Sequence, residues 1–464
     1  MTHERHAVEG KQPPTKRIIL LLDGTWNDEA FGNTDTNIVR LQQIIAKTLD
    51  KEDNEKSSTQ HPLVRSFSDK EGVDNIVYYE RGVGTGWRDR YTGGIFGDGL
   101  NGKIRSAYLF LSYHYDPGAE IFIFGFSRGS YTARSLVGYI AATGLLKRDT
   151  CTPENEHKAW RFYREPPGRR SPGVWSQLQP LMNPLAAFKI DCLGVFDTVG
   201  ALGIPLQRFK LLNRDDFEFH DVDLSSITKV NLHAVAIDEH RNPFEASMWR
   251  KPRFKKYRSA IEQVWFPGVH SDVGGGYIPE LERERDKLPA LDDITLDWML
   301  KRVHHHCPGF PADPEFWPPT GEKWKMANQH ESRDGIYRFM RRTIRSIANY
   351  PLKEDEKAWY DYNGCYDRHA VAIGEKVHIS ALLRLGETVA TNGLMGRYAP
   401  PNLISALPVI LDTYKTPGGP PLSGAEICVV DWSGRQFERD NDKDRLAVQE
   451  VVTAAQARLA ASYG

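Results

Sequence analysis

Residues 121–129 are Ile-Phe-Ile-Phe-Gly-Phe-Ser-Arg-Gly, and the expected architecture is built around them. Positions 121–124 form the β-branched and aromatic run that is typical of a strand covered on both faces. From Arg128 onward, apolar residues recur at helical spacing until Gly144, which supplies a stop signal. The segment therefore predicts a strand, a tight turn at Ser127 and a helix.

The turn gives the Gly-x-Ser-x-Gly pattern around Ser127 a chemical meaning. Side chains beside a serine in so sharp a turn would clash, which explains the glycines at 125 and 129. The helix N-terminus behind the serine offers N–H groups and a positive dipole end to a developing oxyanion. We therefore predict that Ser127 is a nucleophile; the alternative is a glycine-rich turn without chemistry.

Other segments extend the alternation of strands and helices. Further strands are expected at 18–22, 190–196, 230–237 and 264–266. Helices are expected at 102–115, 128–143, 294–306 and about 440–462. This alternation predicts an α/β fold with a mostly parallel sheet flanked by helices, as in α/β-hydrolases. The polar stretch 49–72 and the Pro- and Gly-rich stretch 164–173 are expected to be surface loops.

The chain divides into three expected regions. Residues 1–16 are polar and predict a flexible tail, and residues 17–300 hold the α/β pattern. Residues 301–464 are rich in Pro, Trp and Tyr over much of their length and are expected to form a C-terminal extension packed on the α/β domain.

Composition limits the class of protein. The 464 residues are 40% hydrophobic and 26% charged, which is ordinary for a soluble globular chain. The formal net charge of −1 provides no overall field for nucleic acid, so no such partner is expected. Five scattered cysteines without a CxxC pair indicate reduced thiols in a cytoplasm. Without a signal peptide or a long apolar run, we expect no transmembrane segment, and any export would not use a cleaved signal.

A serine nucleophile needs a base and an acid that orients the base. In α/β-hydrolases the order is serine, acid, histidine. Asp197 ends the strand at 190–196, and His270 follows the strand at 264–266 in a glycine-rich loop, so we assign them as acid and base. A carboxylate beside His270 is expected to raise the pKa of the imidazole. Competing acids and bases nearby in the sequence are Asp238, Glu239, Asp272, His233 and His240.

The first strand ends in Asp23-Gly24-Thr25, which has two interpretations. An early loop in α/β-hydrolases donates the second oxyanion N–H, so Gly24 or Thr25 is expected to assist the N–H of Arg128. The same triplet completes the DxDGT motif of aspartyl-phosphate phosphatases. However, Leu21 stands where that nucleophilic carboxylate belongs, so the phosphatase mechanism fails.

Two other sequence patterns, a glycine-rich stretch and a run of histidines, give weaker indications of a functional site. Gly97–Gly102 matches GxGxxG but follows no convincing strand, so we assign it to a glycine-rich loop at 82–102 rather than to a dinucleotide site. Its aromatic residues Trp87, Tyr91 and Phe96 are candidates for contacting substrate. His304–His306 lie in a helical pattern and cannot share one face, so we expect no metal there and no cofactor.

Several motifs in order resemble a known family of bacterial and fungal α/β-hydrolases. They are LLLDGTWND at 20–28, GVGTG at 82–86, GFSRGSYTARSLVGYI at 125–140, GVFDTVGALG at 194–203, AVAIDEHRNPF at 234–244 and WFPGVHSDVGGGY at 265–277. That family includes the first class of type VI secretion lipase effectors, which are phospholipases. The resemblance implies a lipid ester substrate, a triad at Ser127, Asp197 and His270, and a secretion-apparatus or immunity-protein partner.

Together these patterns predict a serine hydrolase that cleaves carboxylic esters, with lipid or phospholipid acyl esters favoured by the resemblance. The chemistry would pass through an acyl-enzyme. The alternative is a non-catalytic binding protein on a hydrolase scaffold.

Overall fold

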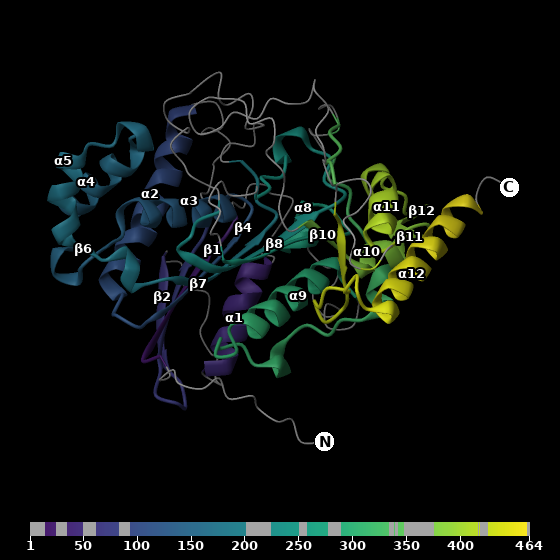
Figure 1. Ribbon diagram of the computed structural model, residues 1–464, viewed down its shortest axis with the longest axis horizontal. Coiled ribbons are helices and arrows are strands. Elements are labelled where there is room, and N and C mark those ends of the chain that lie inside the picture. Colours follow the sequence, from purple (N-terminus) through teal and green to yellow (C-terminus); the bar gives the residue numbers. More distant parts are fainter. Residues whose placement is uncertain are drawn as a thin grey trace.

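The computed structural model describes residues 14–24, 35–49, 62–82, 93–200, 224–249, 258–276, 289–333, 338, 342–347, 375–415, 417 and 426–461. Within these ranges, nine strands form one sheet in the order β13-β10-β9-β8-β7-β4-β1-β3-β2 (Figure 1). Their bounds are β1 Lys16–Leu22, β2 Leu63–Ser68, β3 Asp74–Glu80, β4 Glu120–Phe126, β7 Ile190–Phe196, β8 Thr228–Ala236, β9 Ala260–Phe266, β10 Glu375–His378 and β13 Cys428–Val430. Neighbouring strands are parallel except for β2, which runs antiparallel to β3 at the edge.

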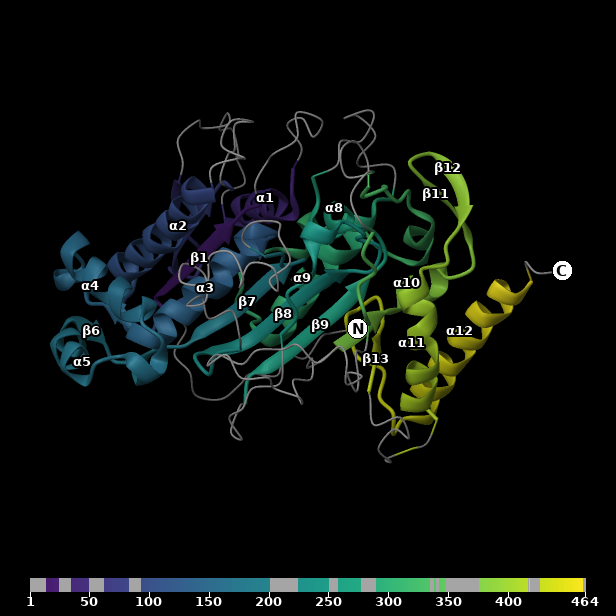
Figure 2. The same ribbon diagram turned by 90° about the horizontal axis from the view of Figure 1, so that it is seen from above.

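Helices pack on both faces of the sheet (Figures 1 and 2). The helices are α1 Asn37–Leu49, α2 Gly93–His114, α3 Arg128–Thr143, α4 Pro153–Arg164, α5 Pro172–Leu178, α8 His270–Gly274, α9 Leu291–His306, α10 Ile379–Arg384, α11 Pro401–Thr413 and α12 Asp442–Ala460. Two small two-stranded pairs are β5 Leu145–Leu146 with β6 Met182–Asn183, and β11 Thr388–Thr391 with β12 Leu394–Arg397. The expected α/β fold with a mostly parallel sheet is confirmed.

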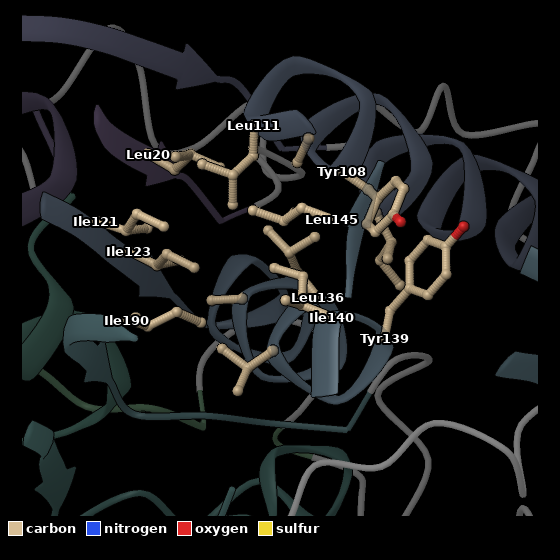
Figure 3. Packing of buried hydrophobic residues seen from close by; sticks show 14 of the residues in the cluster. Leu20, Tyr108, Leu111, Ile121, Ile123, Leu136, Tyr139, Ile140, Leu145 and Ile190 are labelled. Carbon is tan, nitrogen blue, oxygen red and sulfur yellow. The ribbon is translucent and has the colours of Figure 1, made fainter. Parts of the chain in front are cut away.

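Strand β1 shows why its residues form a strand with two covered faces. Ile18 and Leu20 belong to the hydrophobic cluster that includes α2 and α3, whereas Ile19 and Leu21 belong to the cluster that includes α1 and α9. Figure 3 shows the first cluster, in which Leu20 of β1 lies near Leu111 of α2, and Leu136 and Ile140 of α3 belong to the same cluster. An unbroken apolar run is what a strand buried on both faces requires.

The sheet brings the candidate site residues to one edge. Because β4, β7, β8 and β9 are parallel neighbours, their carboxyl ends lie side by side. Phe126 pairs with Phe196, so Ser127 and Asp197 both follow directly after paired residues. His270 begins α8, four residues after β9 ends. This is the edge at which ligands bind in open α/β sheets.

The C-terminal part of the chain adds to the same sheet. Strand β10 pairs with β9, and β13 pairs with β10. A third hydrophobic cluster joins Val235 and Trp265 of the sheet to residues of α10, α11 and α12, and these helices lie together at one end of the molecule (Figure 2). The expected division at residue 300 falls inside α9 and stays a prediction.

Some local expectations were wrong. The glycine-rich loop expected at 82–102 is helical from Gly93 onward, because α2 begins there. The polar stretch 49–72 contains the whole of strand β2, whose edge position allows polar residues to alternate with apolar ones. Among the described residues, no helix is long and apolar enough to cross a membrane.

Candidate active site

Ser127 occupies a strained turn between β4 and α3. Its φ of 58° and ψ of −121° are rare for a residue with a side chain, and such strain is of the order of 1–3 kcal/mol. A Cβ on Gly129 would lie 2.1 Å from the Leu22 carbonyl oxygen, and one on Gly125 would lie 2.7 Å from the Gly129 oxygen. The Ser127 N–H donates to Phe196 O at 3.0 Å. The glycines and this hydrogen bond together allow the sharp turn.

His270 bridges Ser127 and Asp197. Its Nε2 lies 2.8 Å from Ser127 Oγ, and its Nδ1 lies 2.6 Å from Asp197 Oδ2. The imidazole is buried, with the Phe126 and Phe244 rings 4.7 and 5.0 Å from it. The Phe126 ring fits because a Cβ on Gly274 would lie only 1.9 Å from it. The structure thus places the three residues in hydrogen-bonded order.

Asp197 is fully buried and makes several charge-compensating contacts. Its Oδ1 accepts the Ala236 N–H at 2.9 Å. Arg345 donates to both oxygens, from Nη1 to Oδ1 at 2.6 Å and from Nη2 to Oδ2 at 2.9 Å. Burial would raise the pKa of Asp197, but the charge of Arg345 and the hydrogen bond with His270 outweigh it and hold that pKa well below its usual value. The carboxylate is therefore ionised at neutral pH.

The direction of the pKa shift of His270 differs from the expectation. Burial lowers the pKa of the imidazole below its ordinary value, because the charged form loses hydration. The Asp197 carboxylate and Glu239 oppose this change, and Arg241 reinforces it. The expectation of an upward shift was wrong, since it counted the neighbouring carboxylate but not the burial.

Only part of the expected oxyanion region can be described. Gly24 lies against the nucleophile, since a Cβ there would be 3.2 Å from the Ser127 Cβ. However, the Gly24 N–H donates to Asp23 Oδ1 at 2.7 Å. Thr25 lies outside the described residues, and Arg128 is the first residue of α3. An oxyanion role for these N–H groups stays a prediction.

The Asp23 carboxylate is a buried anchor at the end of β1. It also accepts the hydroxyls of Thr36 and Tyr79, at 2.9 Å each from Oδ2. Burial raises its pKa to about 6, against the lowering effect of these hydrogen bonds. Asp23 thus fixes the chain beside Ser127.

The competing acids have other partners. Asp238 accepts the Gly268 N–H at 2.7 Å and the Tyr398 hydroxyl at 2.9 Å, and burial raises its pKa to about 7. Glu239 pairs with Arg241 at 2.9 Å and also accepts the backbone N–H of His270 at 3.2 Å. The remaining acid, Asp272, lies 2.6 Å from the Nδ1 atom of His330.

The competing histidines are also engaged elsewhere. Burial lowers the pKa of His233 to about 3, and its Nδ1 lies 3.3 Å from Gln263 Oε1. His240 lies 3.3 Å from Arg342 Nη2. In the His304–His306 run, considered above as a metal site and not as a source of the base, His306 lies 2.8 Å from Glu262 Oε1. In the described ranges, no group of three or more His, Cys, Asp or Glu residues could hold a metal ion.

Three candidate substrate contacts are not placed by the structure. Trp87 and Tyr91 lie outside the described residues, and only the backbone of Phe96 is described, within α2. Conversely, sequence reasoning missed Arg345. Arginines at 338, 341, 342 and 345 form a basic run, and nothing in that pattern distinguishes the one that turns inward.

The sheet, the strand–turn–helix at Ser127 and the order of the site residues define an α/β-hydrolase-like protein. Residues 16–302 match the family model described as the type VI secretion system (T6SS) phospholipase effector Tle1-like catalytic domain. The chain belongs to that family. The resemblance inferred from the motifs is therefore confirmed.

The individual proteins that resemble this chain share low sequence identity with it. An uncharacterized protein of Saccharomyces cerevisiae is 30% identical over 238 residues, which is 50% of this chain and 32% of the relative. A crystal structure of an uncharacterized Pseudomonas aeruginosa protein has 18% identity and a TM-score of 0.37, covering 67% of this chain and 48% of that one. The Tle1 effector bound to the VgrG spike of the type 6 secretion system has 19% identity and a TM-score of 0.28, with coverages of 60% and 56%. The chain thus spans about a third of the curated relative and about half of each structure.

Proposed function

We propose that this protein is a serine hydrolase that cleaves carboxylic esters of lipids or phospholipids. The main support for this proposal is the pair of hydrogen-bonding contacts made by His270. Its Nε2 lies 2.8 Å from Ser127 Oγ, and its Nδ1 lies 2.6 Å from Asp197 Oδ2. Membership of the Tle1-like catalytic-domain family supports the lipid substrate. The same family description supports a type VI secretion apparatus as partner; an immunity-protein partner remains a prediction from the resemblance.

The proposed reaction has two stages. Ser127 Oγ attacks the ester carbonyl while His270 Nε2 takes its proton, and His270 then gives this proton to the leaving alcohol. Asp197 holds the Nδ1–H tautomer and stabilises the imidazolium that forms. Water activated by His270 then hydrolyses the acyl-Ser127 ester and regenerates the serine. The Arg128 N–H is proposed to stabilise the oxyanion together with the Thr25 N–H, because the Gly24 N–H already donates to Asp23 Oδ1; each donor would contribute about 3 kcal/mol.

The role of Ser127 can be tested by labelling and by substitution. The wild-type protein should react with a fluorophosphonate probe and hydrolyse phospholipid acyl esters in vesicles. Ser127→Ala should abolish labelling and lower kcat by about 10⁴-fold or more while keeping the thermal unfolding transition. Ser176, an exposed helix serine that donates to Pro172 O, offers the matched control Ser176→Ala. Residual hydrolysis by Ser127→Ala within about tenfold of wild type would remove Ser127 from the mechanism.

A folded wild-type protein that neither reacts with the probe nor hydrolyses esters of any chain length would favour the alternative of a binding protein on a hydrolase scaffold. Titration with non-hydrolysable ether lipids would then test binding directly.

A further inference from the structure

Arg345 reaches the back of the candidate site from outside the segment that the family model matches, which ends at residue 302. Besides its two bonds to Asp197, its Nη1 donates to Ala236 O at 2.8 Å and its Nη2 donates to Phe244 O at 2.6 Å. Only 3% of the side chain is exposed. The guanidinium therefore connects the acid, the end of β8 and the turn that contacts His270.

A short segment, residues 342–347, holds Arg345 in place. Arg342 forms an antiparallel bridge with Arg241, and the Thr343 N–H donates to His240 O at 2.9 Å. Asn242 Nδ2 donates to Thr343 Oγ1 at 2.9 Å. At its other end, Ile347 is buried in the cluster of α10–α12. The segment is thus fixed on both sides of Arg345.

We propose that Arg345 is a positioning residue, whose two-pronged contact with Asp197 sets the orientation of the carboxylate toward His270. The proposal rests on the proposed function, because it assigns Asp197 as the acid of the triad. It makes the C-terminal part of the chain a contributor to the active site.

The geometry of Asp197 explains the need for such a group. Its backbone has a positive φ of 39°, so the residue sits in an uncommon conformation. Oδ1 faces Ala236 and Arg345, and Oδ2 faces His270 and Arg345. A planar guanidinium can bind both oxygens at fixed angles, whereas a lysine ammonium supplies only a point charge. The Arg345 guanidinium therefore restricts rotation of the Asp197 carboxylate and also compensates its charge.

A purely structural ion pair would show the same contacts, so the experiment must separate the two roles. We would compare full-length Arg345→Ala, Arg345→Lys and the control Arg342→Ala, whose side chain is exposed on the same segment. The readouts are kcat and KM on a short-chain ester, the rate of fluorophosphonate labelling, and thermal unfolding. Each is measured with and without guanidinium ion at non-denaturing concentration.

The proposal expects Arg345→Ala to lower kcat and the labelling rate by about 10²-fold with KM changed by less than about threefold, since a misplaced catalytic group has effects of that size. Guanidinium should restore at least about tenfold of the loss, and Arg345→Lys should lie between wild type and alanine. Arg342→Ala should behave as wild type.

Three results would overturn it. One is a folded Arg345→Ala with kcat within about threefold of wild type. Another is a loss of kcat that guanidinium does not restore, which indicates only a structural ion pair. If Arg345→Ala does not fold, Arg345→Lys decides, and wild-type kcat in a folded lysine variant rejects the proposal. Ser127→Ala serves as the separate check, because activity in that variant removes the proposed function itself.

Discussion

At the residue scale, one buried carboxylate interacts with two different cationic or potentially cationic groups. Asp197 accepts from Arg345 and lies beside His270, and it is fully buried. Removing one partner from a buried ion pair is destabilising by about 3–5 kcal/mol, because the other charge is left uncompensated. Asp197 is therefore expected to affect both activity and stability, in contrast to Ser127.

The prediction for this residue is a double effect. Asp197→Asn should lower kcat by about 10⁴-fold through the wrong His270 tautomer, and should also lower the free energy of unfolding by about 3–5 kcal/mol. Asp238→Asn should retain most activity, because Asp238 bonds Gly268 and Tyr398 rather than the imidazole. Steady-state kinetics and urea unfolding measure both effects. A greater loss of kcat in Asp238→Asn would move the acid to β8.

His270 gives a prediction for pH. The neutral imidazole accepts the serine proton, so activity should rise with pH as His270 loses its proton. Burial places the pKa of His270 below its ordinary value, so the midpoint of kcat/KM should lie below about pH 6.5. A pH–rate profile measured with an ester that does not ionise over this pH range checks this. A midpoint above that value would mean that the Asp197 carboxylate outweighs burial in the free enzyme.

At the scale of elements, the same residue type has opposite consequences in different places. Gly274 lies in α8, where an added Cβ would be 1.9 Å from the Phe126 ring beside His270. Gly102 is exposed within α2, and a Cβ there would meet no atom within 4 Å. The first glycine allows close packing at the site, whereas the second only weakens a helix.

The matching prediction uses two alanine variants. Gly274→Ala should lower both stability and activity, because Phe126 must move and His270 with it. Gly102→Ala should raise the free energy of unfolding by about 1 kcal/mol and leave kcat unchanged, as expected for glycine replacement in an exposed helix. Chemical denaturation with parallel ester assays distinguishes them. Destabilisation by Gly102→Ala would show that the helix is not present there in solution.

The sequence predicted the elements whose signal is local. The strands at 18–22, 121–124 and 190–196 and the helix from Arg128 have continuous apolar runs or helical spacing, and the structure contains them. Ser127, Asp197 and His270 were proposed from their positions at strand ends. Arg345 and the short strand β10 were missed, because their roles depend on contacts with residues about 110 to 150 positions earlier.

At the scale of the whole molecule, the sheet is continuous across the family-matched segment and the rest of the chain. Strand β10 pairs with β9 in the plane of the sheet, and Trp265 donates from Nε1 to Glu375 Oε2 at 3.1 Å. Val235 and Trp265 are buried against the cluster of α10–α12. Residues beyond 302 therefore complete both the sheet and its core.

Truncation tests this dependence. A chain ending at His306 should not be soluble and active, because it would expose the edge of β9 and an apolar face of the sheet. Size-exclusion chromatography and dye binding to exposed apolar surface would measure this, with full-length Ser127→Ala as the inactive, folded control. A monomeric, ester-hydrolysing 1–306 fragment would contradict it.

The position of Arg345 also has a consequence for timing during synthesis. Asp197 precedes Arg345 by 148 positions, and at about 5–20 residues per second the interval between their syntheses is about 7–30 s. During that interval the proposed acid exists without the guanidinium that we propose orients it. A nascent chain is therefore expected to have little ester-hydrolysing activity until translation is well past the family-matched segment.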